Sequence, residues 1–95
     1  MTTLLLADDH QMFIDGMKVF LEKYDHIAIA GEANNGEEVL DFLETNPVDV
    51  VVLDIEMPGM DGIETTKYIK KKFPSTNVLI LSMFCLLYTS DAADE

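Results

Sequence analysis

The run VDVVVLD, at residues 48–54, constrains the fold of this chain more than any other stretch. Its apolar residues are nearly continuous and mostly β-branched, which is typical of a strand buried on both faces of a sheet. The run ends in an acid, Asp54, which is followed by Glu56 and a Met-Pro-Gly turn. Such a strand needs covering elements on both sides, and it places a carboxylate at its carboxyl end.

Strand-like and helix-like patterns alternate along the rest of the chain. The expected strands are 2–9, 27–33, 48–54 and 77–82, and the expected helices are 10–24, 33–47 and 59–73. The order is β-α-β-α-β-α-β with short connections between the elements. This order predicts an α/β fold in which a parallel sheet carries helices on both faces.

The helical segments show capping signals and apolar faces. Asn35 with Glu38, and Asp61 with Glu64, have the spacing of capping pairs at the starts of the second and third helices. The apolar faces expected from helical spacing are Phe13, Met17, Phe20 and Tyr24 in the first helix, Val39, Leu40 and Leu43 in the second, and Ile63, Thr66, Ile69 and Phe73 in the third.

Length and composition indicate one small globular domain. The chain has 95 residues, of which 48% are hydrophobic, and a formal net charge of −12. That charge argues against this domain gripping a nucleic-acid backbone. No apolar run reaches membrane-spanning length, and the N-terminus lacks the pattern of a signal peptide, so we expect a cytoplasmic protein with no membrane contact. A single cysteine, Cys85, excludes an intramolecular disulfide and fits a reducing compartment.

Polar side chains follow three of the expected strands. Asp8 and Asp9 follow the first strand, Asp54 ends the third and Ser82 ends the fourth. Ligands of open parallel sheets bind beyond these carboxyl ends. If the first and third strands are neighbours, their ends lie roughly 5 Å apart, and each pair of carboxylates then repels by about 3–4 kcal/mol at an effective dielectric constant of about 20. A fold has little structural reason to gather this repulsion at one edge.

A divalent cation offsets the repulsion. Carboxylate oxygens suit Mg²⁺, which typically shares its site with a phosphoryl group. A carboxylate beside such a metal can attack phosphorus and become an aspartyl phosphate. In this interpretation Asp54 is the nucleophile, Ser82 bonds a phosphoryl oxygen, and Pro58 and Gly59 shape a loop that keeps Asp54 accessible.

Each of these residues taken singly also has an ordinary explanation. A lone Asp54 after a strand is usually a turn former, Asp8 and Asp9 are suitable N-caps for the following helix, and a hydroxyl at a strand end is common. Together, in this order of strands, they favour the functional interpretation. His10 and His26 are interpreted as ordinary surface histidines without a metal-binding partner.

Three segments in combination resemble the receiver domain of bacterial two-component response regulators: LLLADDH, VVVLDIEMPGMDG and VLILS. ADDHQMFIDG, GEANNGEE and LSMF are most similar to the branch with a LuxR-type helix-turn-helix output domain. The resemblance covers residues 1–84. It implies a flavodoxin-like fold of strand order 2-1-3-4-5, here reduced to 2-1-3-4 without the fifth strand and the fourth and fifth helices.

The resemblance also implies a role for each site residue. Asp54 is the phosphoacceptor for a sensor histidine kinase, Asp9 is a direct Mg²⁺ ligand, and Asp8 assists mainly through water. The backbone carbonyl of Glu56 completes the protein's share of the coordination, and Ser82 is the switch hydroxyl. The implied module signals rather than catalyses turnover. It controls transcription through a missing DNA-binding domain, and the full-length protein is expected to be able to form a homodimer.

Two features depart from the family pattern. A lysine that pairs with the phosphoryl group ends the family's fifth strand, and no residue after Ser82 is basic here. Residues 85–95, CLLYTSDAADE, instead match a translation of the transposon-end adaptor used to prepare DNA for sequencing. We therefore expect residues 1–84 to be a partial receiver domain and 85–95 a non-native tail. The fourth strand would then be an exposed edge.

Two other functions stay open. A phosphatase of the haloacid dehalogenase type also uses an aspartate nucleophile after a strand, but it carries a second Asp two residues later, where this chain has Glu56. A pseudo-receiver would act only as a binding module, which the set of Asp8, Asp9, Asp54 and Ser82 disfavours. Turnover of a phosphate ester distinguishes the phosphatase, and phosphoryl uptake excludes the pseudo-receiver.

Overall fold

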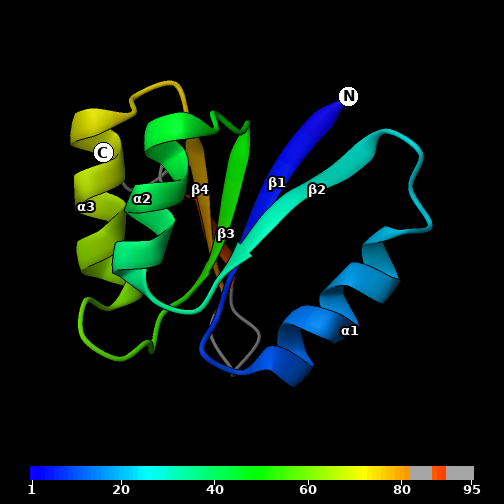
Figure 1. The fold of residues 1–95 in the computed structure, drawn as a ribbon, viewed down its shortest axis with the longest axis horizontal. Coiled ribbons are helices and arrows are strands. Elements are labelled where there is room, and N and C mark those ends of the chain that lie inside the picture. The colour runs from blue at the N-terminus through cyan, green and yellow to red at the C-terminus, as the bar shows by residue number, and fades with distance from the viewer. Residues whose placement is uncertain (82–86, 90–95) are drawn as a thin grey trace.

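The fold is a five-stranded sheet between one helix and a pair of helices. The computed structural model describes residues 1–81 and 87–89. The elements run in the order β1 (Thr2–Ala7), α1 (Gln11–Leu21), β2 (Ile27–Ala33), α2 (Gly36–Thr45), β3 (Val50–Asp54), α3 (Gly62–Lys72), β4 (Asn77–Leu81) and β5 (Leu87–Thr89). Helices α2 and α3 lie side by side over one face of the sheet, and α1 lies over the other (Figure 1). None of the helices in the described residues is both long enough and apolar enough to cross a membrane.

The strand order is β2-β1-β3-β4-β5, and the first four strands are parallel. This confirms the predicted α/β sheet of order 2-1-3-4. One expectation was wrong: β4 is not the edge of the sheet, because β5 pairs antiparallel to it, with Ile80 opposite Tyr88. The side of β4 that faces away from β3 presents unpaired backbone N–H and C=O groups, and the three residues of β5 pair with them.

Two apolar layers explain why the central strands read as continuous hydrophobic runs. Alternate residues of each strand point to opposite faces. Leu5 and Leu53 lie fully buried under α2 and α3, where Val39, Leu43 and Ile69 also pack. On the other face the buried residues are Leu4, Leu6, Val52 and Ile14, and the last of these comes from α1. The predicted apolar face of α2 is therefore confirmed.

Of the apolar face expected for α1, Met17 packs against the sheet, but the aromatic residues Phe13, Phe20 and Tyr24 are exposed. Ile14 is buried, and Met17 and Leu21 pack partly against the same cluster. Phe13 and Phe20, by contrast, are 45% and 54% exposed. The helix has two stripes of apolar residues with helical spacing. The stripe that contains Ile14 packs on the sheet, and the stripe that contains Phe13 and Phe20 does not. In α3, Thr66 and Ile69 are buried and Phe73 is partly buried as expected, but Ile63 is 44% exposed, so that part of the prediction was wrong.

The predicted N-caps hold the second and third helices. Asn35 accepts a hydrogen bond from the backbone N–H of Glu38, and Asp61 accepts one from that of Glu64, both at 2.8 Å. The carboxylate of Glu38 in turn accepts from the backbone N–H of Asn34, one residue before the predicted partner. These caps fix where α2 and α3 begin, next to the carboxyl ends of β2 and β3.

Candidate functional site

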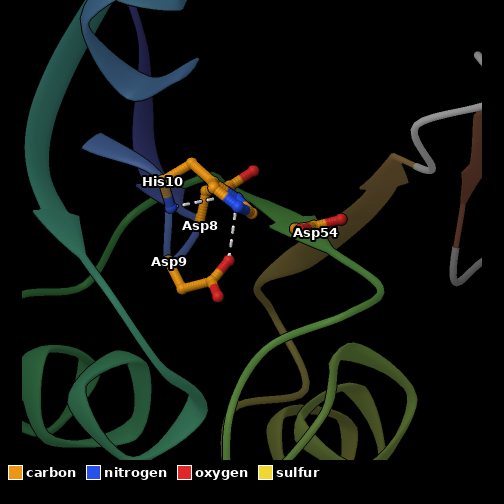
Figure 2. A group of neighbouring side chains, drawn as sticks. All are labelled: Asp8, Asp9, His10 and Asp54. Atoms are coloured by element: carbon orange, nitrogen blue, oxygen red, sulfur yellow. Dashed lines mark hydrogen bonds and ion pairs between the residues drawn. The ribbon is translucent and has the colours of Figure 1, made fainter. Parts of the chain in front are cut away.

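The register of two neighbouring strands brings the predicted acids together. Residue Leu6 of β1 lies opposite Val52 of β3, and Ala7 lies opposite Leu53. The next residues along the two strands, Asp8 and Asp54, therefore emerge at the same edge of the sheet, as the ends of parallel neighbouring strands must (Figure 2).

The resulting cluster contains three carboxylates and one imidazole. Asp8, Asp9, His10 and Asp54 each offer one ligand atom, and these four atoms all lie within 4.8 Å of one another. Asp8 is 5% exposed, Asp54 is half-buried, and Asp9 and His10 are exposed. Oxygen donors at such separations fit a hard divalent cation, since Mg²⁺ is bound by one or two carboxylates with water completing its shell. The residues present therefore fit Mg²⁺.

His10 is the residue that sequence reasoning placed wrongly. Its side chain is 73% exposed, as a surface histidine should be, yet its Nδ1 lies 3.0 Å from Asp8 Oδ1 and 3.0 Å from Asp9 Oδ1 (Figure 2). Its backbone N–H also donates to Asp8 Oδ1 at 2.8 Å. The hydrogen bond to Asp8, and then the negative charge of Asp9, raise the pKa of His10. Its place directly after Asp8 and Asp9 is the one feature of the sequence that puts His10 near the cluster, and that place alone does not predict the contact.

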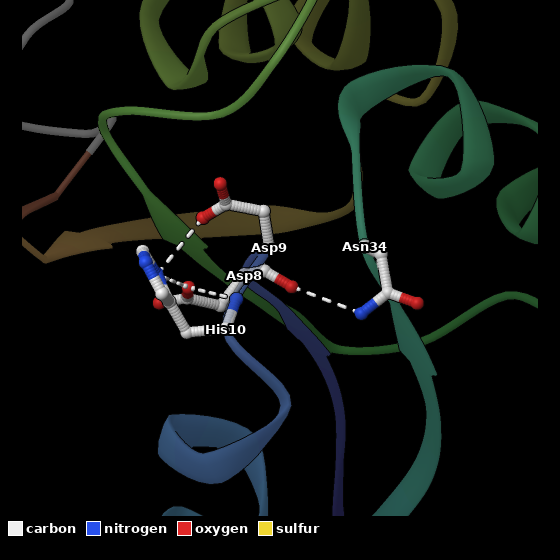
Figure 3. A network of polar contacts seen from close by, with 4 residues as sticks. All are labelled: Asp8, Asp9, His10 and Asn34. Carbon is white, nitrogen blue, oxygen red and sulfur yellow. Dashed lines mark hydrogen bonds and ion pairs between the residues drawn. The ribbon is translucent and has the colours of Figure 1, made fainter.

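A second residue that the sequence analysis did not assign to the site anchors it. The side-chain amide of Asn34 donates to the backbone carbonyl of Asp8 at 3.1 Å (Figure 3). The backbone N–H of Asp8 donates to Ala33 at the same distance. The end of β1 is thus tied to the end of β2 on both sides of Asp8, which fixes the direction of its carboxylate.

The segment after Asp54 forms an open depression beside the cluster. Asp9, His10 and the loop residues Ile55, Glu56, Met57, Pro58, Gly59 and Asp61 line it. Gly59 has φ of +76°, a value that residues with a side chain rarely adopt, so the turn depends on glycine. The loop closes where the backbone N–H of Gly62 donates to the carbonyl of Ile55 at 2.8 Å. Glu56, Pro58 and Gly59 therefore border the cluster, while Ser82 lies outside the described residues.

Burial and charge act on Asp54 in the same direction. Desolvation is the largest cause, the negative charge of Asp8 is the next, and together they raise the pKa of Asp54 above its ordinary value of 3.8. The backbone N–H of Glu56 opposes this by bonding the carboxylate. An ionised Asp54 is therefore held in an unfavourable environment, which a bound cation would relieve.

This environment predicts a pH-dependent effect of Asp54→Asn on stability. A carboxyl whose folded-state pKa is raised stabilises the fold below its unfolded-state pKa, and that stability is lost as pH rises through the folded-state pKa. Without metal, Asp54→Asn should therefore be more stable than wild type at neutral pH, and the gain should shrink as pH falls toward 3.8. Urea unfolding with EDTA across this range measures it, with Asp41→Asn on exposed α2 as control. A variant less stable than wild type at neutral pH contradicts the argument.

Comparisons with a family model and with related sequences agree on one protein family. A model described as the response regulator receiver domain matches residues 4–90, which is most of the chain and continues past residue 84. The chain belongs to the response regulator receiver family. It is 37% identical over 81 residues to the nitrate/nitrite response regulator NarL of Escherichia coli K12, covering 85% of this chain and 38% of NarL. It is 38% identical over 84 residues to the transcriptional regulatory protein LiaR of Bacillus subtilis, covering 88% and 40%.

Solved structures agree with the sequence relatives. The RcsB response regulator of Salmonella typhimurium superposes with a TM-score of 0.82 at 32% identity, covering 86% of this chain and 42% of RcsB. The isolated receiver domain of RcsB, solved in the presence of the phosphomimetic BeF₃⁻, gives a TM-score of 0.81 at 32% identity, covering 86% of this chain and 62% of that one. The receiver chain described here thus spans about two fifths of the length of NarL and LiaR.

Proposed function

We propose that this chain is the phosphoacceptor receiver module of a two-component response regulator, phosphorylated on Asp54 by a sensor histidine kinase in a Mg²⁺-dependent reaction. One observation carries the proposal: ligand atoms of Asp8, Asp9 and Asp54 converge within 4.8 Å at the carboxyl ends of β1 and β3. The family supports it, since receiver domains of response regulators are signalling modules.

The chemistry assigned to Asp54 is nucleophilic displacement at phosphorus. One carboxylate oxygen forms a bond to the phosphorus of a phosphohistidine while the P–N bond breaks, and the departing imidazole nitrogen keeps the electron pair and takes up a proton. Mg²⁺, when bound, would neutralise charge on the phosphoryl oxygens. Asp9 would hold the ion directly, Asp8 mainly through water, and Glu56 through its backbone carbonyl. Ser82 is proposed as the switch hydroxyl from its place directly after β4.

Control of transcription belongs to the same proposal. The response regulator NarL and the transcriptional regulatory protein LiaR are each more than twice as long as this chain. RcsB has been solved bound to promoter DNA in the presence of BeF₃⁻ and as dimers on DNA. By analogy, phosphorylation of Asp54 would control a DNA-binding output domain and dimer formation in the full-length protein. The net charge of −12 fits this division of labour, because the receiver itself would be repelled by DNA.

The first test is phosphoryl uptake from a small donor. The chain is incubated with phosphoramidate and Mg²⁺, and intact-mass spectrometry counts the phosphoryl groups added. We expect one group on wild type and on the control Asp41→Asn, and none on Asp54→Asn or in the presence of EDTA. Release of the group by hydroxylamine identifies an acyl phosphate. Uptake that survives Asp54→Asn, or no uptake by a folded chain that binds Mg²⁺, would overturn the proposal.

The same samples separate the receiver from the phosphatase alternative. A receiver accepts one phosphoryl group per chain and releases it slowly, whereas a phosphatase releases many equivalents of inorganic phosphate from an ester such as p-nitrophenyl phosphate. Glu56 stands where the phosphatase pattern needs an aspartate, so we expect no steady release above that of Asp54→Asn.

A further inference from the structure

The side chain of His10 does not cap helix α1, although His10 occupies the N-cap position. That side chain makes no capping hydrogen bond, and the first turn of α1 contains no acidic residue. A side chain that caps a helix at this position stabilises it by bonding an otherwise unpaired backbone N–H. The imidazole instead lies against Asp8 and Asp9 (Figure 3). The chain therefore forgoes a cap on α1 and adds a nitrogen donor to the cluster of acids.

The spacing of the donors is close to that of one coordination sphere. Nitrogen and oxygen ligands bind Zn²⁺ at about 2.0–2.2 Å in a tetrahedral arrangement, so two ligands of the same ion lie about 3.3–3.6 Å apart. His10 Nδ1 lies 3.0 Å from an oxygen of each of Asp8 and Asp9. A single ion between these atoms would replace these two contacts after the donors separate by a few tenths of an ångström.

The donor set then decides which ion is preferred. Carboxylates and water alone suit Mg²⁺, whereas an imidazole nitrogen favours first-row transition ions, for which affinity rises from Mn²⁺ toward Cu²⁺ and Zn²⁺. Asp8, Asp9, Asp54 and His10 offer four donors, the number that a closed zinc site uses. Their atoms lie within 4.8 Å of one another, so the side chains would draw together around the ion.

We propose that His10 is the specificity-determining residue of this metal site: its Nδ1 joins Asp8, Asp9 and Asp54 in binding Zn²⁺, which thereby competes with Mg²⁺. The inference rests on the proposed function in taking the three acids as the metal site. Zn²⁺ would occupy the position that phosphoryl transfer to Asp54 needs for Mg²⁺, and it would hold the His10 side chain over the acids. Phosphorylation of Asp54 would then depend on the relative concentrations of Zn²⁺ and Mg²⁺ as well as on the kinase.

The test measures the affinity for each ion directly. All proteins carry Cys85→Ser, because a thiol would bind Zn²⁺ by itself. Zn²⁺ affinity is measured by competition with a chromophoric zinc chelator at about pH 8, above the ordinary histidine pKa of about 6.5, because the neighbouring acids raise the pKa of His10. Mg²⁺ affinity is measured by calorimetry. His10→Gln is compared with the matched control His26→Gln, whose imidazole lies away from the cluster and contacts Tyr24.

We expect His10→Gln to weaken Zn²⁺ binding by at least about tenfold, as loss of even an outer partner of a metal ligand does, and to leave Mg²⁺ affinity within about twofold because oxygen ligands carry it. His26→Gln should change neither. Equal Zn²⁺ affinity in wild type and His10→Gln, or an equal loss for both ions, would overturn the inference.

A second measurement needs no variant at position 10. In ¹⁵N NMR of the wild-type chain, Zn²⁺ should shift the Nδ1 resonance of His10 and leave His26 unmoved, whereas Mg²⁺ should leave both unmoved. A Zn²⁺ shift at His26 alone, or at neither histidine, contradicts the assignment. These readouts do not use phosphorylation. A folded chain that binds Zn²⁺ through His10, but with Mg²⁺ bound in place of Zn²⁺ takes up no phosphoryl group, would therefore refute the proposed function and leave this inference standing.

Discussion

Gly62→Ala is expected to lower the free energy of unfolding by about 2–3 kcal/mol, in the range of a methyl group forced into a filled site. A Cβ at Gly62 would lie 2.5 Å from the backbone oxygen of Asp54 and 2.9 Å from the Cα of Ile55. Both are main-chain atoms, so no side-chain rotation relieves the clash. The start of α3 would have to move away from β3, or the loop carrying Asp54 would have to shift.

The displacement should also weaken the metal site. Gly62 N–H donates to the carbonyl of Ile55, and this bond closes the loop that borders Asp54. The folded fraction of Gly62→Ala should therefore bind Mg²⁺ more weakly than wild type, which calorimetry below the unfolding midpoint measures.

The matched control is Gly16→Ala, the same substitution in α1. A Cβ at Gly16 meets nothing within 4 Å, and alanine is preferred to glycine inside a helix by about 1 kcal/mol. Urea unfolding should thus show opposite signs for the two variants. Gly62→Ala with wild-type stability would mean that α3 and β3 are not packed as described.

The fold was largely predictable because nearly every residue of a central strand is apolar when both faces of that strand are buried. Leu5 and Leu53 face α2 and α3, while Leu4 and Val52 face α1, so both sides of the central strands had to be apolar. A strand whose apolar residues are continuous, rather than alternating with polar ones, indicates burial on both faces. The acids at the strand ends were predictable for the same reason, because the register of β1 and β3 follows once the strands are neighbours.

The face of α1 was not predictable from spacing alone. Helical periodicity identifies stripes of apolar residues but does not say which stripe meets the sheet. The aromatic residues Phe13 and Phe20 suggested one face, and the sheet buries Ile14 with Met17 and Leu21 instead.

His10 and Asn34 were missed because they act through the geometry of turns. Neither has a motif that separates it from an ordinary surface residue. Each joins the site only because the carboxyl ends of β1 and β2 lie side by side, so that Asn34 reaches the backbone of Asp8 and His10 folds back over the acids. Contacts of this kind depend on a few backbone angles after each strand, which the amino-acid pattern does not fix.

Gly36→Ala is the second substitution with a large expected effect, again about 2–3 kcal/mol of lost stability. A Cβ at Gly36 would lie 2.2 Å from Thr65 Oγ1 and 3.0 Å from the backbone oxygen of Met60. Thr65 is fully buried, and its hydroxyl donates to the carbonyl of Asp61 at 2.7 Å, so it has a bond to lose if it rotates. The clash must also exceed the gain of about 1 kcal/mol that alanine brings to a helix.

A double-mutant cycle separates the two contacts. Thr65→Ala removes the nearer atom, so Gly36→Ala should cost about 1–2 kcal/mol less in that background than in wild type, measured by urea unfolding. The cost that persists reports the main-chain oxygen of Met60, which no substitution removes. Additive effects would show that α2 and α3 do not meet at these residues. Gly36 begins α2 in close contact with α3, and Gly62 begins α3 in close contact with the backbone at the end of β3. Glycine at both positions is therefore a packing requirement that brings α2 and α3 together and holds the loop after Asp54 in place.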